Sequence, residues 1–301
     1  MIDIAIVGAG TAGMTAAIYA RRAGMDVSVF EGNTYGGQIV ATPEVENYPG
    51  YEKISGFDLA DSIFRQASSL DAKFVFDQIN KVEKTESGFV LKGDFGDYEA
   101  KTVIIATGAT NRHLEIDKEA ELTGRGISYC ATCDGAFFKG KVTAVAGGGN
   151  TAVEDALYLA GLCSKVYIIH RRDGFRAEET LMAKARETEN IEILTPFVTE
   201  SLEGDGKLSS VVLKNAVDGS TKTLDIDGLF VAIGQVPATK AFEDLVEMEG
   251  GYIKAGEDCV TSCPGVFAAG DVRTKHVRQL ATAASDGAIA ALAAVSCIKM
   301  Q

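Results

Sequence analysis

The chain has 301 residues, of which 46% are hydrophobic and 24% are charged, and this length predicts about two globular domains with a full hydrophobic core. The net charge of −13 argues against nucleic acid or an anionic membrane as a partner. The first residues lack the basic region of a signal peptide, and the apolar stretch at 287–298 is shorter than the roughly 20 residues of a membrane span, so we expect a cytoplasmic protein.

The amino-terminal stretch has the pattern of a nucleotide-binding βαβ unit. A short apolar strand is followed by the sequence GAGTAG at residues 8–13, a helical pattern, and a second strand that ends at Glu31. Gly8 permits the turn, and Gly10 lets backbone N–H groups reach a pyrophosphate. The carboxylate of Glu31 is placed to accept hydrogen bonds from ribose hydroxyls. The combination predicts a dinucleotide site that takes a free ribose.

The next hundred residues predict a long loop, a helix and a small sheet. Residues 36–50 are irregular, and a loop of this length tends to be functional, although an exposed connection would have the same composition. Residues 57–70 have helical spacing, and residues 74–103 alternate like short strands. An apolar strand at 101–108 then closes the first unit with Thr-Gly.

Cys130 and Cys133 are separated by two residues, and such a pair can close and reopen a disulfide. Asp134 follows directly and could give a proton to a leaving thiolate. A CxxC pair alone is a weak signal, since half of a zinc site has the same spacing. Here the pair stands between two nucleotide-binding patterns, which favours a redox role. In a cytosolic protein this disulfide would be a working part of the site.

A second copy of the opening pattern follows, with a strand, the sequence GGGNTA at 147–152, a helix and another strand. Superposing Gly147 on Gly8 puts His170 where the first copy has Glu31, with Arg171, Arg172 and Arg176 after it. Guanidinium groups bind a 2′-phosphate that a carboxylate would repel. The second copy therefore predicts NADP(H) as its ligand. A solvated charged face is the alternative explanation of the arginines.

The duplication continues to the end of the chain. Residues 191–225 alternate like 74–103, and a strand at 229–234 closes the second unit. A further strand at 265–271 ends in Gly-Asp, and a helix of small residues follows at about 278–297. We therefore expect an α/β protein with two Rossmann-like, three-layer dinucleotide-binding domains, the second inserted into the first. The predicted domains are 1–114 with 242–301, and 115–241.

These motifs together resemble the low-molecular-weight thioredoxin reductases, which form class II of the pyridine nucleotide-disulfide oxidoreductases. The resemblance covers almost the whole chain and is carried most specifically by CATCDG at 130–135 and HRRDGFRA at 170–177. It is also carried by residues 8–13, 36–38, 44–50, 147–159 and 265–271 and by Arg278-Gln279. The resemblance implies a homodimer that transfers electrons from NADPH, through FAD and the Cys130/Cys133 disulfide, to the disulfide of thioredoxin.

The resemblance also implies roles for single residues. Cys133 would face the flavin, Cys130 would attack the partner disulfide, and Asp134 would act as acid and base. The residues implied for FAD are Gly8, Gly10, Thr11, Ala12, Glu31, Gly37, Gln38, Asn47, Thr107, Gly108, Gly270, Asp271, Arg278, Gln279 and Leu280. Those implied for NADPH are Gly149, Asn150, Thr151, Ala152, His170, Arg171, Arg172, Arg176, Ile233 and Gly234. Leu280 departs from the family, which usually has a small residue there.

Because the dithiol would share a domain with the NADPH site, the resemblance implies that one domain rotates on the other, with hinges near 111–117 and 236–242.

Other enzymes on this architecture fit less well. A ferredoxin-type NADP reductase lacks the CxxC, and the flavoprotein of a peroxide-reducing system has an extra amino-terminal dithiol domain. A donor such as ferredoxin occurs in relatives that have lost the second fingerprint, which is present here. A redox-sensing binding protein would not need dithiol, flavin and arginines together. Cys259 and Cys263 have no His at ligand spacing, so we expect no metal site.

Overall fold

The computed structural model describes residues 1–300, and the chain divides into two compact units. The first unit is Met1–Thr110 with Val236–Gln301, and the second is Asn111–Gln235. The second unit therefore interrupts the first in the sequence. The predicted boundaries, after residues 114 and 241, lie a few residues further along the chain. The two crossings are short paired strands, β7 (Ala109–Asn111) and β16 (Gln235–Pro237).

The first unit is built on a seven-stranded mixed sheet in the order β3-β2-β1-β6-β5-β4, with β19 pairing the end of β6. Strands β1, β2, β3, β6 and β19 are parallel, whereas β4 and β5 add an antiparallel meander to β6. The strands are β1 (Ile2–Val7), β2 (Val27–Phe30), β3 (Lys73–Val75), β4 (Ile79–Thr85), β5 (Gly88–Gly93), β6 (Asp97–Ile105) and β19 (Val266–Ala268).

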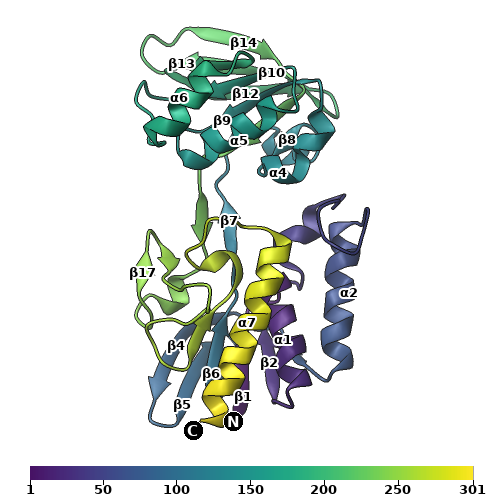
Figure 1. Cartoon of the computed structure of the whole chain (residues 1–301), viewed down its shortest axis with the longest axis vertical. Helices are drawn as coiled ribbons and strands as arrows, with labels where there is room; N and C mark the ends of the chain where they lie inside the picture. The colour runs from purple at the N-terminus through teal and green to yellow at the C-terminus, as the bar shows by residue number, and fades with distance from the viewer. Residues whose placement is uncertain (301) are drawn as a thin grey trace. The chain divides into compact units, whose positions relative to one another are not determined.

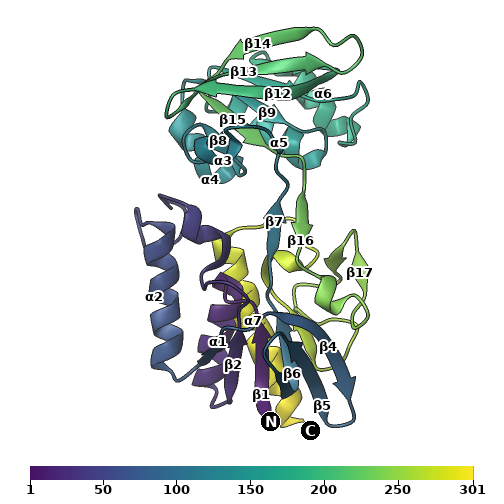
Figure 2. The same ribbon diagram turned by 180° about the vertical axis from the view of Figure 1, so that it is seen from behind.

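Successive side chains of β1 point to opposite faces of this sheet, and both faces are covered. Ile4 and Ile6 join a core with α1 (Thr11–Arg22), α2 (Gly56–Ser69) and α7 (Leu280–Lys299). Ala5 and Val7 join a second core with the meander and buried residues between 242 and 255. The α2 helix and the β17 (Met248–Glu249) segment lie on opposite sides of this unit in both ribbon views (Figures 1 and 2).

The second unit has a five-stranded parallel sheet in the order β11-β10-β9-β15-β8. Ala144 of its central strand packs toward an antiparallel meander, and Val145 packs toward the helices. The unit therefore has the three layers meander, sheet and helices (Figure 1). Its elements are β8 (Ile127–Ser128), β9 (Val142–Ala146), β10 (Lys165–Ile169), β11 (Ile191–Leu194), β12 (Phe197–Gly204), β13 (Leu208–Asn215), β14 (Thr221–Asp225), β15 (Gly228–Val231), α5 (Asn150–Ala160) and α6 (Glu179–Glu187).

Short elements complete both units. They are α3 (Glu119–Leu122), α4 (Ala131–Asp134), β18 (Tyr252–Ile253) and the 3-10 turns η1 (Gly37–Ala41), η2 (Gly135–Phe138), η3 (Lys240–Phe242) and η4 (Gly270–Val272). The loop predicted at 36–50 thus contains one 3-10 turn. The prediction of an α/β protein with two Rossmann-like, three-layer domains is confirmed.

Helix α7 corrects one prediction. The apolar stretch at 287–298 is shorter than a membrane span. It belongs to α7, however, which is 20 residues long and could cross a membrane by length and composition alone. The prediction counted only the run after Asp286. One face of the helix packs against α1 of the first unit, because a Cβ added at Gly287 would collide with the backbone oxygen of Ala12, and Ala290, Ala291 and Ala294 are fully buried. We therefore assign α7 to the core of the first unit.

Candidate functional site

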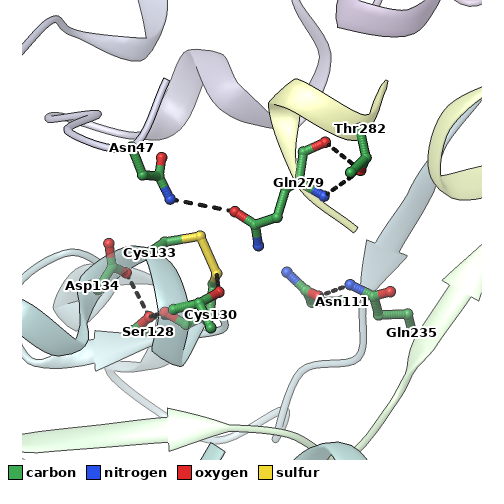
Figure 3. The surroundings of a disulfide bond; sticks show 10 residues. Asn47, Asn111, Ser128, Cys130, Cys133, Asp134, Gln235, Gln279 and Thr282 are labelled. Atoms are coloured by element: carbon green, nitrogen blue, oxygen red, sulfur yellow. Dashed lines mark hydrogen bonds between the residues drawn. A yellow bond between two sulfur atoms is a disulfide. The ribbon is translucent and has the colours of Figure 1, made fainter. Parts of the chain in front are cut away.

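The two cysteines of the second unit form a disulfide at the start of α4. Cys130 occupies the N-cap position of this short helix in an extended conformation, and Cys133 lies one turn further on (Figure 3). Cys130 is half-buried, whereas Cys133 is exposed. The helix follows β8, so a parallel strand of the second sheet positions the sulfur pair. The reversible dithiol predicted from the CxxC spacing is therefore present in its disulfide form.

Asp134 closes α4 and is bonded to a residue that sequence reasoning missed. The Ser128 hydroxyl donates to Asp134 Oδ2 at 2.5 Å and accepts from the Cys130 N–H at 3.1 Å (Figure 3). Burial raises the pKa of the Asp134 carboxyl above its usual value, although the Ser128 hydrogen bond opposes that shift. A carboxyl with a raised pKa is better suited to donate a proton near neutral pH. The only sequence signal for Ser128 was a hydroxyl two residues before Cys130.

The glycine turn of the first unit lies between β1 and α1. Gly8 has a φ of +107°, and a Cβ there would collide with the backbone oxygen of Ala106. Gly10 is the N-cap of α1, and a Cβ built on it meets no atom within 4 Å. The amino end of α1, where Thr11 and Ala12 begin the helix, therefore has open space for a phosphate group next to free backbone donors.

Glu31 lies at the end of β2, as predicted for a ribose-binding carboxylate. Its two oxygens accept from the backbone N–H groups of Ala9 at 2.9 Å and Asn33 at 3.0 Å. These bonds fix the carboxylate beside the glycine turn. Each oxygen keeps acceptor capacity for a further donor such as a hydroxyl.

The loop after Glu31 packs onto the same turn. The Gly36 N–H donates to the Ala9 oxygen at 2.8 Å, and a Cβ on Gly37 would lie 3.4 Å from the Gly10 Cα. Gln38 donates to the Ala109 oxygen, and Asn47 donates to the Gln279 side chain at 3.3 Å (Figure 3). The structure thus brings residues of the predicted flavin site together from four segments of the first unit.

The Gly270–Asp271 segment lies next to α1 as well, since a Cβ on Gly270 would lie 2.9 Å from the Ala12 Cβ. Asp271 Oδ1 is buried and has no hydrogen-bond partner among residues 1–300. Burial raises the pKa of Asp271. An unsatisfied buried carboxylate oxygen is expensive, so a ligand hydroxyl or amide at this place would relieve it. The open amino end of α1, the Glu31 carboxylate and the unsatisfied Asp271 oxygen therefore suit a dinucleotide in the first unit.

The remaining predicted flavin residues lie around these groups. Thr107 donates to the Ala238 oxygen at 2.7 Å, and Gly108 has a φ of +69°. Arg278 stacks on the ring of Tyr252 at 4.3 Å, and its Nε is buried without a partner among the described residues. Leu280 begins α7 and packs against the helical core, which gives its bulk a structural reason.

The second glycine turn repeats the first in its own unit. Gly149 is the N-cap of α5, and a Cβ built on it meets no atom within 4 Å. Asn150, Thr151 and Ala152 form the first turn of this helix. The amide of Asn150 exchanges two hydrogen bonds with Glu178, at 2.8 and 3.1 Å, so the loop after β10 is tied to the amino end of α5. This turn also has room for a phosphate group.

His170 follows β10 and is buried against Gly148, because a Cβ on that glycine would collide with the imidazole ring. Burial lowers the pKa of His170, and the neighbouring arginines add to the shift. Arg171, Arg172 and Arg176 are exposed, and none makes an ion pair within the described part of the chain. The Arg176 N–H donates to the Gly148 oxygen at 2.8 Å, which holds the arginine segment at the turn.

Ile233 and Gly234 follow β15 at the same edge of the second sheet. Gly234 has a φ of +116° and accepts from the Arg112 N–H at 3.0 Å. The preceding residue, Ala232, lies against the glycine turn, since a Cβ on Gly147 would collide with its backbone oxygen. The predicted NADPH residues therefore gather at one end of the second sheet.

The other four cysteines lie outside the CxxC pair, and Cys297 is the one among them that is partly exposed. Cys163, Cys259 and Cys263 are buried, and burial raises the pKa of Cys259 to about 12. No group of three or more His, Cys, Asp or Glu side chains within residues 1–300 is arranged to hold a metal ion.

Comparison with known proteins adds three findings. The model of the pyridine nucleotide-disulphide oxidoreductase family matches residues 2–288. A thioredoxin reductase of Listeria innocua is 45% identical over 290 residues, which are 96% of this chain and 91% of the relative, and one of Bacillus subtilis strain 168 is 44% identical over 96% of this chain and 92% of the relative. The crystal structure of thioredoxin reductase from Streptococcus pyogenes MGAS5005 superposes with a TM-score of 0.95 at 39% identity, over 100% of this chain and 99% of that one.

Proposed function

This chain belongs to the pyridine nucleotide-disulphide oxidoreductases, and within them to the low-molecular-weight thioredoxin reductases, and on that premise we propose that it reduces the disulfide of thioredoxin at the expense of NADPH. The family resemblance predicted from the motifs is confirmed, and it implies a flavin and a pyridine nucleotide as cofactors. The observation that supports the proposal most is the Cys130–Cys133 disulfide, which lies beside a carboxyl in the unit that also carries the second glycine turn.

FAD is the flavin we assign to the first unit. Residues at the amino end of α1 would hold its phosphates, Glu31 would accept from a ribose hydroxyl, and Asp271 would satisfy its buried oxygen on the flavin's polar chain. NADPH is the nucleotide we assign to the second unit, where Arg171, Arg172 and Arg176 would bind the 2′-phosphate. When bound, NADPH supplies a hydride and FAD relays the two electrons to the Cys130–Cys133 disulfide, which becomes the dithiol.

The cysteines then carry out thiol–disulfide exchange. The Cys130 thiolate attacks one sulfur of the acceptor disulfide, which forms a mixed disulfide and releases the other acceptor sulfur as a thiolate. Cys133 attacks Cys130 Sγ, which restores the enzyme disulfide and releases the second acceptor thiolate. The enzyme dithiol loses two electrons and the acceptor gains two. Asp134 supplies a proton to a departing thiolate.

Trapping the mixed disulfide tests these roles. The probe is a thioredoxin with a single active cysteine, which carries an aromatic thiol in a mixed disulfide. Cys130 should displace the aromatic thiol and become linked to thioredoxin. In Cys133→Ser no second thiol can break that link, so thioredoxin should remain covalently attached. Cys130→Ser should not accumulate that adduct, although its remaining thiol is the more exposed of the two in this structure. Intact-mass spectrometry reads the result. An adduct that forms on Cys133 and not on Cys130 would reverse the two roles.

The proposal includes a homodimer in the cytoplasm. Sedimentation velocity of the flavin-loaded protein tests the first of these, and a monomer at micromolar concentration would contradict it. Neither the dimer nor the compartment is needed for the chemistry described above.

A further inference from the structure

Ser128 lies between the acid and the nucleophile of the proposed reaction and contacts both. Its hydroxyl is 2.5 Å from Asp134 Oδ2, 3.1 Å from the Cys130 nitrogen and 3.3 Å from the Cys130 carbonyl oxygen (Figure 3). The residue is 4% exposed, so water does not replace these partners. A serine hydroxyl has one hydrogen to donate and two lone pairs to accept with. The Cys130 N–H always occupies one lone pair, which leaves one hydrogen and one lone pair for the other two contacts.

These contacts fit both protonation states of Asp134. When Asp134 is a carboxylate, the Ser128 hydrogen points at Oδ2, in the short geometry of a hydroxyl bonded to an anion. When Asp134 is protonated, its own O–H donates to Ser128 Oγ, and the Ser128 hydrogen turns to the Cys130 carbonyl oxygen. Each state is satisfied, and the change between them requires only a rotation about the Cβ–Oγ bond of Ser128.

We propose that Ser128 is a positioning residue that holds Asp134 in a usable orientation in both protonation states and ties it to the backbone of Cys130. The inference rests on the proposed function, because it gives Asp134 the proton to donate. As Asp134 passes its proton to a leaving thiolate, the Ser128 hydrogen returns from the Cys130 carbonyl to the new carboxylate. One O–H bond breaks at Asp134, one S–H bond forms, and no other reactant is required.

Few other groups face Asp134. Helix α5 packs against α4 and carries Glu154, Asp155 and Tyr158, and η2 follows α4 directly. The raised pKa of Asp134 comes from burial, with no contribution from a neighbouring charge. The Ser128 hydrogen bond is the one interaction that lowers it. Removing the hydroxyl should therefore move the titration of Asp134 further upward.

The test uses the flavin-loaded enzyme and measures kcat/KM for thioredoxin from pH 5 to pH 10. The limb of the profile that reports Asp134 should move up by about one pH unit in Ser128→Ala. The reason is that a lost hydrogen bond to a carboxylate destabilises the charged form by about the free energy of one pKa unit. Ser128→Thr keeps a hydroxyl and should restore the wild-type limb. Ser164→Ala removes an exposed hydroxyl of the same unit and should leave the profile unchanged. In an Asp134→Asn background, Ser128→Ala should cause no further loss in rate.

Three results would overturn the inference while the wild type still reduces thioredoxin. The Ser128→Ala profile could match the wild type, the threonine could fail to restore it, or the serine change could slow the Asp134→Asn enzyme by the same factor as the wild type. If Ser128→Ala does not fold, the comparison moves to Ser128→Thr against Ser128→Val, which have the same shape and differ in the hydroxyl. Failure of the proposed function is distinct, because the wild type itself would then be inactive with NADPH and thioredoxin.

Discussion

A buried ion cluster offers a sharp test of how the first unit holds its flavin-site segment. Asp286 of α7 is 2% exposed and accepts from Gly270 N–H, Arg273 Nε and Lys275 Nζ, each at 2.9 Å, on one oxygen. Its other oxygen accepts from Arg273 Nη2 at 2.9 Å. Arg273 is 1% exposed. The carboxylate therefore compensates a buried guanidinium and fixes the backbone next to Asp271.

The change Asp286→Asn keeps the volume and removes the charge. It leaves Arg273 without its buried counter-ion, and breaking such a pair costs about 3–5 kcal/mol. For a folding unit of this size each kcal/mol lowers the melting temperature by about 2–4 °C, so we expect a loss of about 10 °C. The Gly270 N–H also loses its carboxylate acceptor, so FAD should dissociate more readily.

The matched control is Glu257→Gln. Glu257 accepts from the same guanidinium at 3.2 Å, but its side chain is 89% exposed. An exposed ion pair contributes at most about 1 kcal/mol, so this variant should melt within about 3 °C of the wild type. Circular dichroism follows the melting, and flavin fluorescence follows the release of FAD. The reasoning fails if Asp286→Asn melts with the wild type or if the two variants lose equal stability.

The same cluster predicts how stability depends on pH. Burial would raise the pKa of Asp286, but hydrogen bonds from Arg273 and Lys275 outweigh it and hold that pKa below the usual value of 3.8. A carboxyl whose pKa is depressed on folding contributes stability above its unfolded pKa, and that contribution is lost as pH falls through the folded pKa. The stability difference between wild type and Asp286→Asn should therefore persist from neutral pH to about pH 4 and shrink below it.

Two further predictions concern the proposed NADPH site. Replacing Arg171 and Arg172 by Ala should raise the KM for NADPH at least about tenfold and leave that for NADH nearly unchanged, since about 1.5–3 kcal/mol is lost with each charged hydrogen bond; equal changes in steady-state assays with the two donors would exclude a role in reading the 2′-phosphate. Gly149→Ala should weaken NADPH binding in isothermal titration without lowering the melting temperature, because the added Cβ meets no protein atom within 4 Å; unchanged affinity would place the phosphates elsewhere.

Much of the fold could be predicted because its signals are local. The strand, glycine turn, helix and strand of each nucleotide-binding unit follow one another in the sequence, and both copies were placed to within a few residues. The predicted turn at 147–152 includes the first three residues of α5, since Asn150 already belongs to the helix. The sequence analysis does not predict helix α6, because its sequence, ETLMAKARE, is mostly polar and buries only Met182 and Ala185.

The contacts that complete the sites could not be predicted, because they join residues far apart in the sequence or depend on one hydroxyl. Arg273 lies before α7 and donates to Asp286 within that helix, and nothing in their sequence spacing marks the two residues as partners. Ser128 reads as one polar residue beside the CxxC, and only the fold of α4 brings Asp134 back to it. The predicted phosphate-binding residues, in contrast, belong to short glycine motifs that can be recognised in the sequence. The open space beside Gly10 and Gly149 is a direct consequence of those glycines.

An anaerobic titration of the flavin-loaded wild type tests the central claim most directly. Two equivalents of NADPH, one for the flavin and one for the disulfide, should bleach the flavin absorbance and release two thiols, and addition of oxidised thioredoxin should then restore the oxidised spectrum with one thioredoxin reduced per electron pair. A flavin that NADPH does not reduce, or a reduced enzyme that thioredoxin does not reoxidise, would contradict the account.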